Sequence, residues 1–365
     1  MDPKSHSTEN SAWRLRHLAL VTDAWEPQIN GVVRTYQRLI GDLRDAGWRV
    51  TVIHPGEFRC VPLPSDPNIR IAINVWPRLT RRLKELQPDC IHLATEGPLG
   101  MMARLWCGFH KYQFTTSFHT KFPEFIQERM GIPLILTYAL AKWFHSRASA
   151  MLVPTPSLMT YLRKRGFKSC KQWTHGVDAE KFHPSKRVEL GYAKPVALYV
   201  GRVSVEKNLE PFLSLEMPGT KLIVGEGPGR EELEKKYPNA VFLGAKYGEE
   251  LAGLFASADV FVFPSRTDTF GLVLLEALAS GTPIAGYPVT GPIDVANDER
   301  VGGISEDLGT AITHALKCSR EECRKYAERF GWDEAERIFV ESLVPMRRGL
   351  MVETVQEERP QENLS

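Results

Sequence analysis

The chain has 365 residues, of which 43% are hydrophobic and 25% are charged, and its formal net charge is +2. This length and balance predict one large or two ordinary globular domains, with no nucleic acid among the expected partners. No run approaches the roughly 18 apolar residues that cross a bilayer, and the first residues lack the apolar centre of a signal peptide, so we expect a cytoplasmic protein.

Short apolar runs alternate with helix-length amphipathic stretches along the whole chain. Uncharged strands that are separated in this way indicate parallel sheets covered on both faces. The predicted strands are 17–22, 48–53, 90–95, 113–119 and 150–155 in the first half, and 195–201, 220–225, 240–244 and 259–265 in the second. Two such series predict an α/β protein with two doubly wound, Rossmann-like domains.

The polar stretch 182–195 separates the two series, because the periodicity lapses there and Pro, Gly and Lys accumulate. We therefore predict domains at residues 15–190 and 191–345, and the last helix of the second, at 331–344, is a candidate to pack back on the first. Residues 1–14 are expected to form a flexible segment and residues 346–365 a polar tail.

Ligands of open α/β sheets bind at the carboxyl ends of the strands, so the loops that follow the strands hold the candidate site residues. Asn30 and Gly31 follow the first strand and precede a helix, where a glycine lets a phosphate or sugar approach and the helix amides favour negative charge. Arg202 and Lys207 follow the first strand of the second domain, and two cations there suit a diphosphate. Plain structural turns or solvated loops would show the same patterns.

Two further loops carry weaker signals. Gly225, Glu226 and Gly227 predict a turn beside a ligand, although a turn without a ligand fits equally well, and they do not form the dinucleotide-binding fingerprint. His119 ends a predicted strand, where a structural and a catalytic histidine are equally compatible with the sequence.

The segment 265–285 is suited to a buried helix closed by a glycine, yet it contains two carboxylates, Asp268 and Glu276. If the segment is helical, the two lie about 12 Å apart, near the span of a sugar diphosphate with its ribose. Asp268 is expected to accept hydrogen bonds from hexose hydroxyls and Glu276 from ribose hydroxyls. The residues between them that we expect to line the donor are Thr269, Phe270, Gly271, Leu272 and Val273.

Charge is distributed unevenly between the two halves. Residues 1–180 contain 24 Lys and Arg against 15 Asp and Glu, whereas the remainder contains 22 against 29. A basic first half indicates an anionic partner, either a membrane surface or an anionic substrate, although solvated faces of unequal composition would look the same. The six cysteines are scattered without metal-binding spacing, so we expect buried free thiols and no metal site.

These residues together resemble the family 4 retaining glycosyltransferases of the GT-B fold, in which two Rossmann-like domains face each other across a cleft. In that family an acid, seven residues and a glutamate bind the donor, which matches Asp268 and Glu276. The family's diphosphate-binding cations correspond to Arg202 and Lys207, its N-terminal glycine turn to Gly31 and its sugar-facing histidine to His119. One departure is Asp268, where the family usually has Glu; the shorter side chain bears on the identity of the donor sugar.

The resemblance implies transfer of a hexose from a UDP- or GDP-hexose to an acceptor hydroxyl with retained anomeric configuration. The branch that looks most similar contains bacterial glycolipid synthases and mannosyltransferases, so the expected acceptor is a membrane lipid such as diacylglycerol; a polysaccharide or soluble glycan is the alternative. The protein would then contact the cytoplasmic face of an anionic membrane. The resemblance assigns catalytic roles to His119, Arg202, Lys207 and Asp268.

The expected mechanism uses the departing diphosphate to take the proton of the acceptor hydroxyl, while Arg202 and Lys207 stabilise the growing charge. No D-x-D motif occurs, so we expect neither a metal ion nor another cofactor. Rival interpretations are a sugar-nucleotide epimerase, a dinucleotide-dependent oxidoreductase, which the missing fingerprint disfavours, and a non-catalytic sugar-nucleotide sensor or scaffold.

Overall fold

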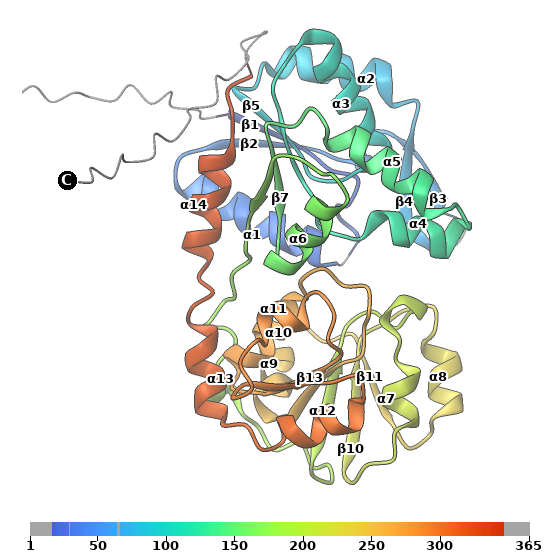
Figure 1. The fold of residues 1–365 in the computed structure, drawn as a ribbon, viewed down its shortest axis with the longest axis vertical. Coiled ribbons are helices and arrows are strands. Elements are labelled where there is room, and N and C mark those ends of the chain that lie inside the picture. The colour runs from blue at the N-terminus through green and yellow to red at the C-terminus, as the bar shows by residue number, and fades with distance from the viewer. Residues whose placement is uncertain (1–16, 29, 64–65, 347–365) are drawn as a thin grey trace, which may run out of the picture.

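A computed structural model describes residues 17–28, 30–63 and 66–346. Two halves lie one above the other, the first coloured blue to green and the second yellow to orange (Figure 1). The predicted flexible segment 1–14 and, apart from Met346, the predicted tail 346–365 lie outside the described residues. Within the described ranges, no helix is long and apolar enough to cross a bilayer.

The first half is built on a six-stranded parallel sheet with the order β2-β1-β5-β6-β7-β8. Its order reverses between β1 and β5, which is where ligands bind in such sheets. A separate antiparallel hairpin, β3-β4, lies beside it. The strands are β1 (His17–Val21), β2 (Arg49–Ile53), β3 (Arg59–Leu63), β4 (Asp66–Ile73), β5 (Cys90–Leu93), β6 (Thr115–Ser117), β7 (Ala150–Val153) and β8 (Cys170–Gln172).

The helices of the first half pack apolar stripes against this sheet. In α1, the Asn30 side chain accepts a hydrogen bond from the Val33 amide at 3.0 Å and so caps the helix start. The helices are α1 (Gly31–Asp45), α2 (Val75–Leu86), α3 (Pro98–His110), α4 (Phe122–Met130), α5 (Leu134–His145) and α6 (Pro156–Lys164), with a short 3-10 turn η1 (Pro55–Glu57).

The second half repeats the plan with a parallel sheet of order β11-β10-β9-β12-β13-β14. Its strands are β9 (Val196–Val200), β10 (Thr220–Val224), β11 (Val241–Gly244), β12 (Val260–Phe263), β13 (Ile284–Gly286) and β14 (Gly302–Ile304). Its helices are α7 (Glu210–Ser214), α8 (Arg230–Lys236), α9 (Gly248–Ser257), α10 (Leu272–Ala279), α11 (Pro292–Val295), α12 (Leu308–Ala315) and α13 (Arg320–Ala327), with 3-10 turns η2 (Pro184–Lys186) and η3 (Val205–Lys207). The predicted fold class, two doubly wound parallel sheets, is confirmed.

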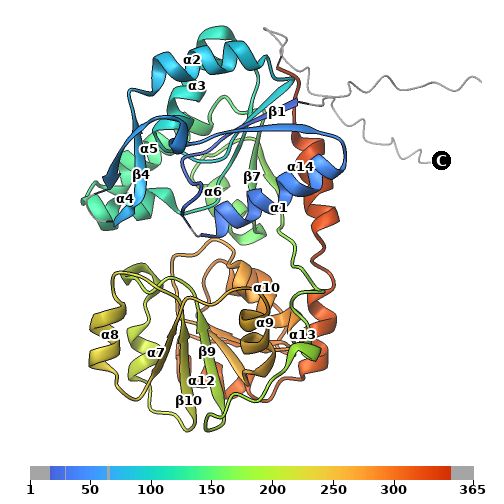
Figure 2. The same ribbon diagram turned by 180° about the vertical axis from the view of Figure 1, so that it is seen from behind.

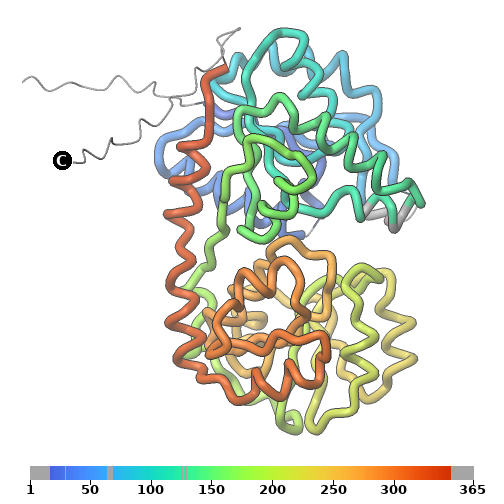
Figure 3. The backbone as a smooth tube through the Cα atoms, in the orientation of Figure 1, coloured from blue at the N-terminus to red at the C-terminus, as the bar shows by residue number. Residues whose placement is uncertain are grey.

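The chain passes between the halves twice. Val177 and Phe182, which precede the expected boundary at residue 190, pack in the core of the second half. At the other end, α14 (Trp332–Ser342) runs from α13 up the side of the first half, as Figures 2 and 3 show. Phe339 of α14 is buried in the core of the first half, and the Trp173 indole donates to the Ala335 carbonyl at 2.8 Å. The C-terminal helix therefore ties the halves together.

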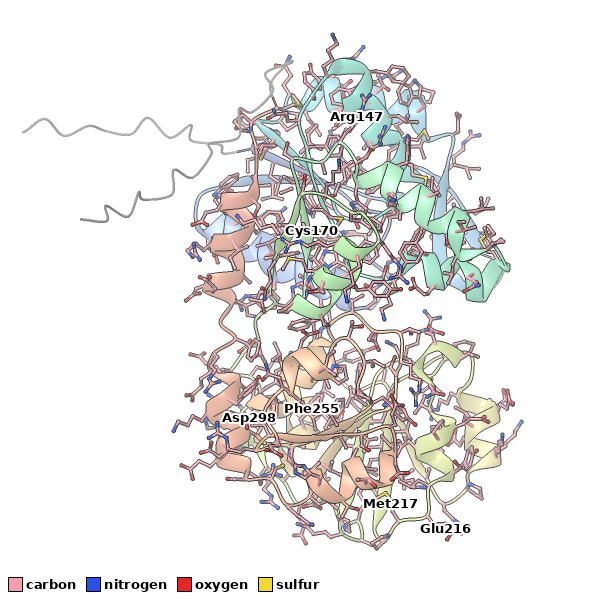
Figure 4. All side chains as sticks on the ribbon, in the orientation of Figure 1. Arg147, Cys170, Glu216, Met217, Phe255 and Asp298 are labelled. Atoms are coloured by element: carbon pink, nitrogen blue, oxygen red, sulfur yellow. The ribbon has the colours of Figure 1, made fainter. Side chains whose placement is uncertain are left out.

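All six cysteines are free thiols. The expectation that they are buried holds only for Cys90, Cys107 and Cys323. Cys60, Cys170 and Cys318 are partly exposed; Cys170 lies on β8, the edge strand of the first sheet, and is labelled in Figure 4. An edge strand has a neighbour on one side only, which leaves its side chains closer to solvent.

Candidate functional site

The predicted site residues follow β1, β6, β9, β10 and β12, either in the loop after the strand or in the helix to which that loop leads; Leu272, Val273 and Glu276 lie in α10. Three contacts between the two halves involve these residues. The Arg34 side chain of α1 forms an ion pair with Glu276 of α10, and the Thr269 hydroxyl donates to the His119 carbonyl. The His175 and Phe270 rings meet edge to face at 4.8 Å. The candidate site is therefore shared by both halves.

Lys207 and Asp268 form the charged centre on the side of the second half. The Lys207 ammonium lies 2.6 and 2.8 Å from the two Asp268 carboxylate oxygens, and each side chain is about a quarter exposed. Two hydrogen bonds from side chains to backbone carbonyls fix the loops that hold them. The side-chain amide of Asn208 donates to the Pro264 carbonyl, and the Thr290 hydroxyl donates to the Asp268 carbonyl, each at 3.0 Å. An ammonium held in this way is a fixed positive charge available to an anionic ligand.

Arg202 lies in the loop after β9, five residues before Lys207. The Tyr199 hydroxyl, buried in the second sheet, donates to the Arg202 carbonyl at 2.8 Å and holds the loop. The neighbouring glycine turn approaches the same loop closely. A Cβ at Gly225 would lie 1.8 Å from the Gly201 carbonyl oxygen, and one at Gly227 would lie 2.1 Å from that of Val203. Only glycines permit this contact between the two loops.

The Glu226 carboxylate, which was expected to help bind the donor, pairs with Arg230 on α8 and is exposed. The backbone of the turn, rather than this side chain, is what faces the loop after β9: the Val203 amide donates to the Glu226 carbonyl at 2.9 Å.

Glu276 is buried in α10, with 4% of its surface exposed. One carboxylate oxygen, Oε1, pairs with Arg34, whereas Oε2 is shielded from solvent and has no hydrogen-bond partner among the described residues. A buried carboxylate oxygen without a donor is costly, so a ligand hydroxyl that donates to it would be stabilised.

The estimated 12 Å between Asp268 and Glu276 assumed one continuous helix, and this assumption is wrong. The helix begins only at Leu272, and Gly271 before it has the left-handed conformation, with φ of 82°. Residues 268–271 therefore form a loop that carries Asp268 to Lys207. Phe270 in this loop is buried, and Leu272 at the helix start reaches within 3.8 Å of the Cβ position of Gly31.

A cavity of about 220 Å³ opens beside the Arg34 and Glu276 pair. Residues of both halves line it, including Gln37, Gly176, Lys181, Leu272 and Trp332. It lies where α1, α10 and the two crossing segments converge, and its polar lining can receive a hydroxylated ligand.

His119 belongs to a buried polar network in the first half. Its Nε2 lies 2.7 Å from the Tyr36 hydroxyl, which also contacts His92 Nε2 at 2.9 Å and Ser117 at 3.0 Å. The His119 ring stacks on that of His175 at a centroid distance of 5.7 Å. Sequence reasoning placed His119 at the site but gave no sign that its ring is held by Tyr36.

Burial keeps these histidines neutral. Desolvation lowers the pKa of His92 and of His175 to about 3, and the pKa of His119 is also lowered, first by burial and then by the neighbouring His175 and His92. A neutral imidazole beside the cleft donates and accepts hydrogen bonds without adding positive charge.

Sequence reasoning missed four residues that connect the halves or support the site: Arg34, Tyr36, His175 and Asp294. Asp294 on α11 accepts hydrogen bonds from the Ser157 amide, at 3.0 Å, and from the Ser157 hydroxyl on α6. Arg34 lies one turn after Gly31 and carries a charge at the start of a helix, a signal that could have drawn attention to it. Its partner Glu276 is 242 positions away, and no spacing rule links the two.

Two family models match the chain: "Glycosyltransferase Family 4" over residues 29–181 and "Glycosyl transferases group 1" over residues 194–318. The chain is 33% identical to a GDP-mannose-dependent alpha-mannosyltransferase of Mycobacterium tuberculosis, over 85% of this chain and 89% of that protein. It is 30% identical to sulfoquinovosyl transferase SQD2 of Arabidopsis thaliana, over 82% and 68%, and 25% identical to an alpha-monoglucosyldiacylglycerol synthase of Streptococcus pneumoniae, over 82% and 78%.

Solved structures share the fold at lower identity. A sucrose-phosphate synthase from Thermosynechococcus elongatus superposes with a TM-score of 0.73 at 20% identity, over 89% of this chain and 98% of that one. The HepE protein of Anabaena, in complex with UDP and glucose, superposes with a TM-score of 0.65 at 13% identity, over 90% and 99%. At these identities, both similarities show a shared fold, with two sheets arranged in the same way.

Proposed function

Because the chain belongs to the family 4 glycosyltransferases of the GT-B fold, and is thus a retaining hexosyltransferase, we propose that it transfers a hexose from GDP- or UDP-hexose to a lipid hydroxyl at a membrane surface. GDP-mannose is the first donor to test, because the mycobacterial relative at 33% identity is named for it. The lipid acceptor is supported by the relative named as an alpha-monoglucosyldiacylglycerol synthase.

The observation that carries the proposal is the pair of charged contacts at the cleft. Lys207 pairs with Asp268 within the second half, and Arg34 of α1 pairs with Glu276 of α10 between the halves, so the site holds two cations and two carboxylates. In the proposed complex, Glu276 Oε2 accepts hydrogen bonds from ribose hydroxyls and Lys207 with Arg202 holds the diphosphate. Asp268 then binds hydroxyls of the hexose.

The proposed transfer needs no protein nucleophile. The bond between the anomeric carbon and the diphosphate oxygen breaks, the acceptor oxygen forms its bond on the same face, and the departing diphosphate takes the acceptor's proton. Lys207 and Arg202 stabilise the negative charge that grows on the diphosphate, a role that a divalent metal has in other enzymes. Neutral His119, held by Tyr36, contacts the hexose without opposing the positive charge that develops at the ring.

A membrane surface is supported by the outer face of α5. Ile135, Leu136, Leu140 and Trp143 are exposed there, with Ile135 at 79%, and Lys142 lies on the same helix. Apolar side chains beside cations suit an interface with anionic lipid, and the first half carries the excess of Lys and Arg. We propose peripheral binding through this face.

The test is hexose transfer by the full-length protein to vesicles that contain diacylglycerol or phosphatidylinositol, with a panel of GDP- and UDP-hexoses, followed by mass spectrometry. We expect a hexosylated lipid whose amount is unchanged by EDTA. Ile135→Glu with Leu136→Glu should lower transfer to vesicles but leave hydrolysis of the donor intact. Product on a soluble glycan alone would contradict the lipid acceptor, and loss of activity in EDTA would contradict metal independence.

A further inference from the structure

A second polar cluster lies beside the site, in the first half. It consists of Glu124 on α4, Tyr138 on α5 and Tyr161 on α6, with Lys121 and Arg165 next to them. The two tyrosine hydroxyls donate to Glu124 Oε1 at 2.7 and 3.2 Å and lie 3.1 Å from each other. Three helices thus converge on one carboxylate oxygen.

The other oxygen of this carboxylate is an unsatisfied hydrogen-bond acceptor. Glu124 Oε2 is shielded from solvent and has no hydrogen-bond partner among the described residues. A carboxylate oxygen in that position accepts hydrogen bonds and cannot donate them. Its matching ligand is therefore a group that donates, such as a hydroxyl.

The cluster faces the catalytic side of the first half. α4 begins three residues after His119. Tyr161 lies one helical turn after Ser157, whose hydroxyl reaches Asp294 of the second half, and α6 lies opposite α11 in Figure 1. Lys121 interacts electrostatically with both Glu124 and Asp268, which couples the cluster to the charged centre of the site.

Two cations cover the tyrosine rings and help to fix them. The Arg165 guanidinium lies 3.6 Å from the centroid of the Tyr161 ring and 5.1 Å from that of Tyr138, and the Lys121 ammonium lies 5.8 Å from that of Tyr161. Such contacts hold aromatic rings in place, so the two hydroxyls and the carboxylate are preorganised.

The cluster also adjoins the face proposed to meet the membrane. Tyr138 is buried on the inner side of α5, while Ile135 and Leu136 are exposed on the same helix. A helix is about 10 Å across. The outer face of α5, where a lipid would be held, is therefore about one helix diameter from Tyr138 on its inner side.

We propose that Glu124, Tyr138 and Tyr161 form the subsite for the acceptor, and that they bind hydroxyls of an uncharged, hydroxyl-rich head group of the polyol or sugar class. The subsite rests on the proposed function, because it specifies where that reaction's acceptor binds. Glu124 Oε2 accepts a hydrogen bond from one hydroxyl of the head group, and the tyrosine hydroxyls position the carboxylate. A second hydroxyl is thereby directed toward the donor held at Asp268 and Lys207.

The experiment compares Tyr161→Phe and Glu124→Ala with the wild type in the vesicle assay, with donor and acceptor concentrations varied separately. We expect the KM for the acceptor to rise about 3- to 10-fold in Tyr161→Phe and more in Glu124→Ala, because each loses hydrogen bonds to or around the head group. The KM for the donor, and hydrolysis of the donor by water, should change less than about twofold. Tyr326→Phe is the matched control. It removes a tyrosine hydroxyl on α13, in the second half, that donates a hydrogen bond to Asn297 at 2.7 Å.

Thermal unfolding separates a folding defect from a binding defect. If Glu124→Ala does not fold, the result of Tyr161→Phe decides alone, because it removes only a hydroxyl. An unchanged acceptor KM in the folded variants, or a donor KM that rises equally, would overturn the subsite. If the wild type instead glycosylates a soluble glycan, the lipid part of the proposed function fails, and a rise in the KM for that glycan would still support the subsite.

Discussion

The two halves share one topology but build their polar sites in different ways. Each has a six-stranded parallel sheet whose order reverses beside its first strand. In the second half, the charged centre of the site lies at the edge of an apolar core, with Lys207 and Asp268 partly exposed, and Glu276 of α10 is the buried carboxylate. In the first half, polar side chains enter the core itself, where Tyr36, His92 and His119 are all buried.

In the proposed complex, the difference follows from the part of the ligand that each half binds. A diphosphate carries charge, and fixed cations on glycine-shaped loops can meet it without being buried beforehand. In the proposed complex the first half contacts the uncharged hexose, and it holds a neutral histidine through a chain of hydrogen bonds in a dry interior. In the proposed complex, the same fold therefore offers fixed charges to the diphosphate of the donor and a preorganised neutral network to the reacting hexose.

The largest expected effect is on kcat and comes from Lys207 in the second half. Lys207→Ala should lower kcat by about 10²- to 10³-fold, because it removes a cation that stabilises the departing diphosphate. Steady-state transfer measures this, with thermal unfolding to check the fold. Lys235→Ala is the control, since its ammonium pairs with Glu231 at 2.7 Å on the exposed side of α8. Equal activity of the two variants would contradict the role of Lys207.

Low pH should lower the free energy of unfolding through the buried neutral histidines of the first half. The unfolded histidines titrate near pH 6.5, whereas His92 and His175 have a folded pKa of about 3. Between these values the unfolded chain binds more protons, so the free energy of unfolding falls as the pH falls below 6.5. From pH 7.5 to 5.5 the two together should remove about 3 kcal/mol at most.

Urea unfolding at the two pH values measures this loss. His92→Gln should reduce the pH dependence, whereas His314→Gln, at an exposed position, should leave it unchanged. A wild type that is equally stable at both pH values would argue against neutral buried histidines.

Matched tyrosines compare the two cores directly. Tyr36 and Tyr199 are both buried, but the Tyr36 hydroxyl contacts three side chains, whereas the Tyr199 hydroxyl donates to one carbonyl. Tyr36→Phe should therefore lower the free energy of unfolding by about 2 kcal/mol and Tyr199→Phe by about 1 kcal/mol. Tyr36→Phe should also lower kcat, because His119 loses its support. Equal losses from the two variants would show that the network adds nothing.

The smallest effect concerns the contact between the halves. Arg34→Ala, Glu276→Gln and the double variant form a cycle in which we expect a coupling free energy of about 1 kcal/mol. The value is modest because the Arg34 side chain is 38% exposed, so solvent screens its attraction to the buried Glu276. Denaturant unfolding measures it, and strictly additive losses would mean that the ion pair does not hold the halves together.

Much of the architecture is predictable from the sequence, because uncharged strands at regular spacing specify parallel sheets. The rule that ligands bind at strand carboxyl ends then selects the loops that hold Gly31, Lys207 and Asp268. The estimate of about 12 Å failed, because it took the whole segment from Asp268 to Glu276 as helical and the left-handed Gly271 interrupts it. The pairing of Arg34 with Glu276 and the ring contact of His175 with Phe270 depend on how the two halves meet, which local spacing does not encode.

The most direct measurement is calorimetric titration of GDP and UDP into the wild type, Lys207→Ala and Tyr161→Phe. If the second half holds the donor and the first half the acceptor, one nucleotide binds the wild type and Tyr161→Phe equally well. The same nucleotide should bind Lys207→Ala about 10- to 100-fold more weakly. Unchanged affinity in Lys207→Ala, or an equal loss in Tyr161→Phe, would contradict this division between the two halves.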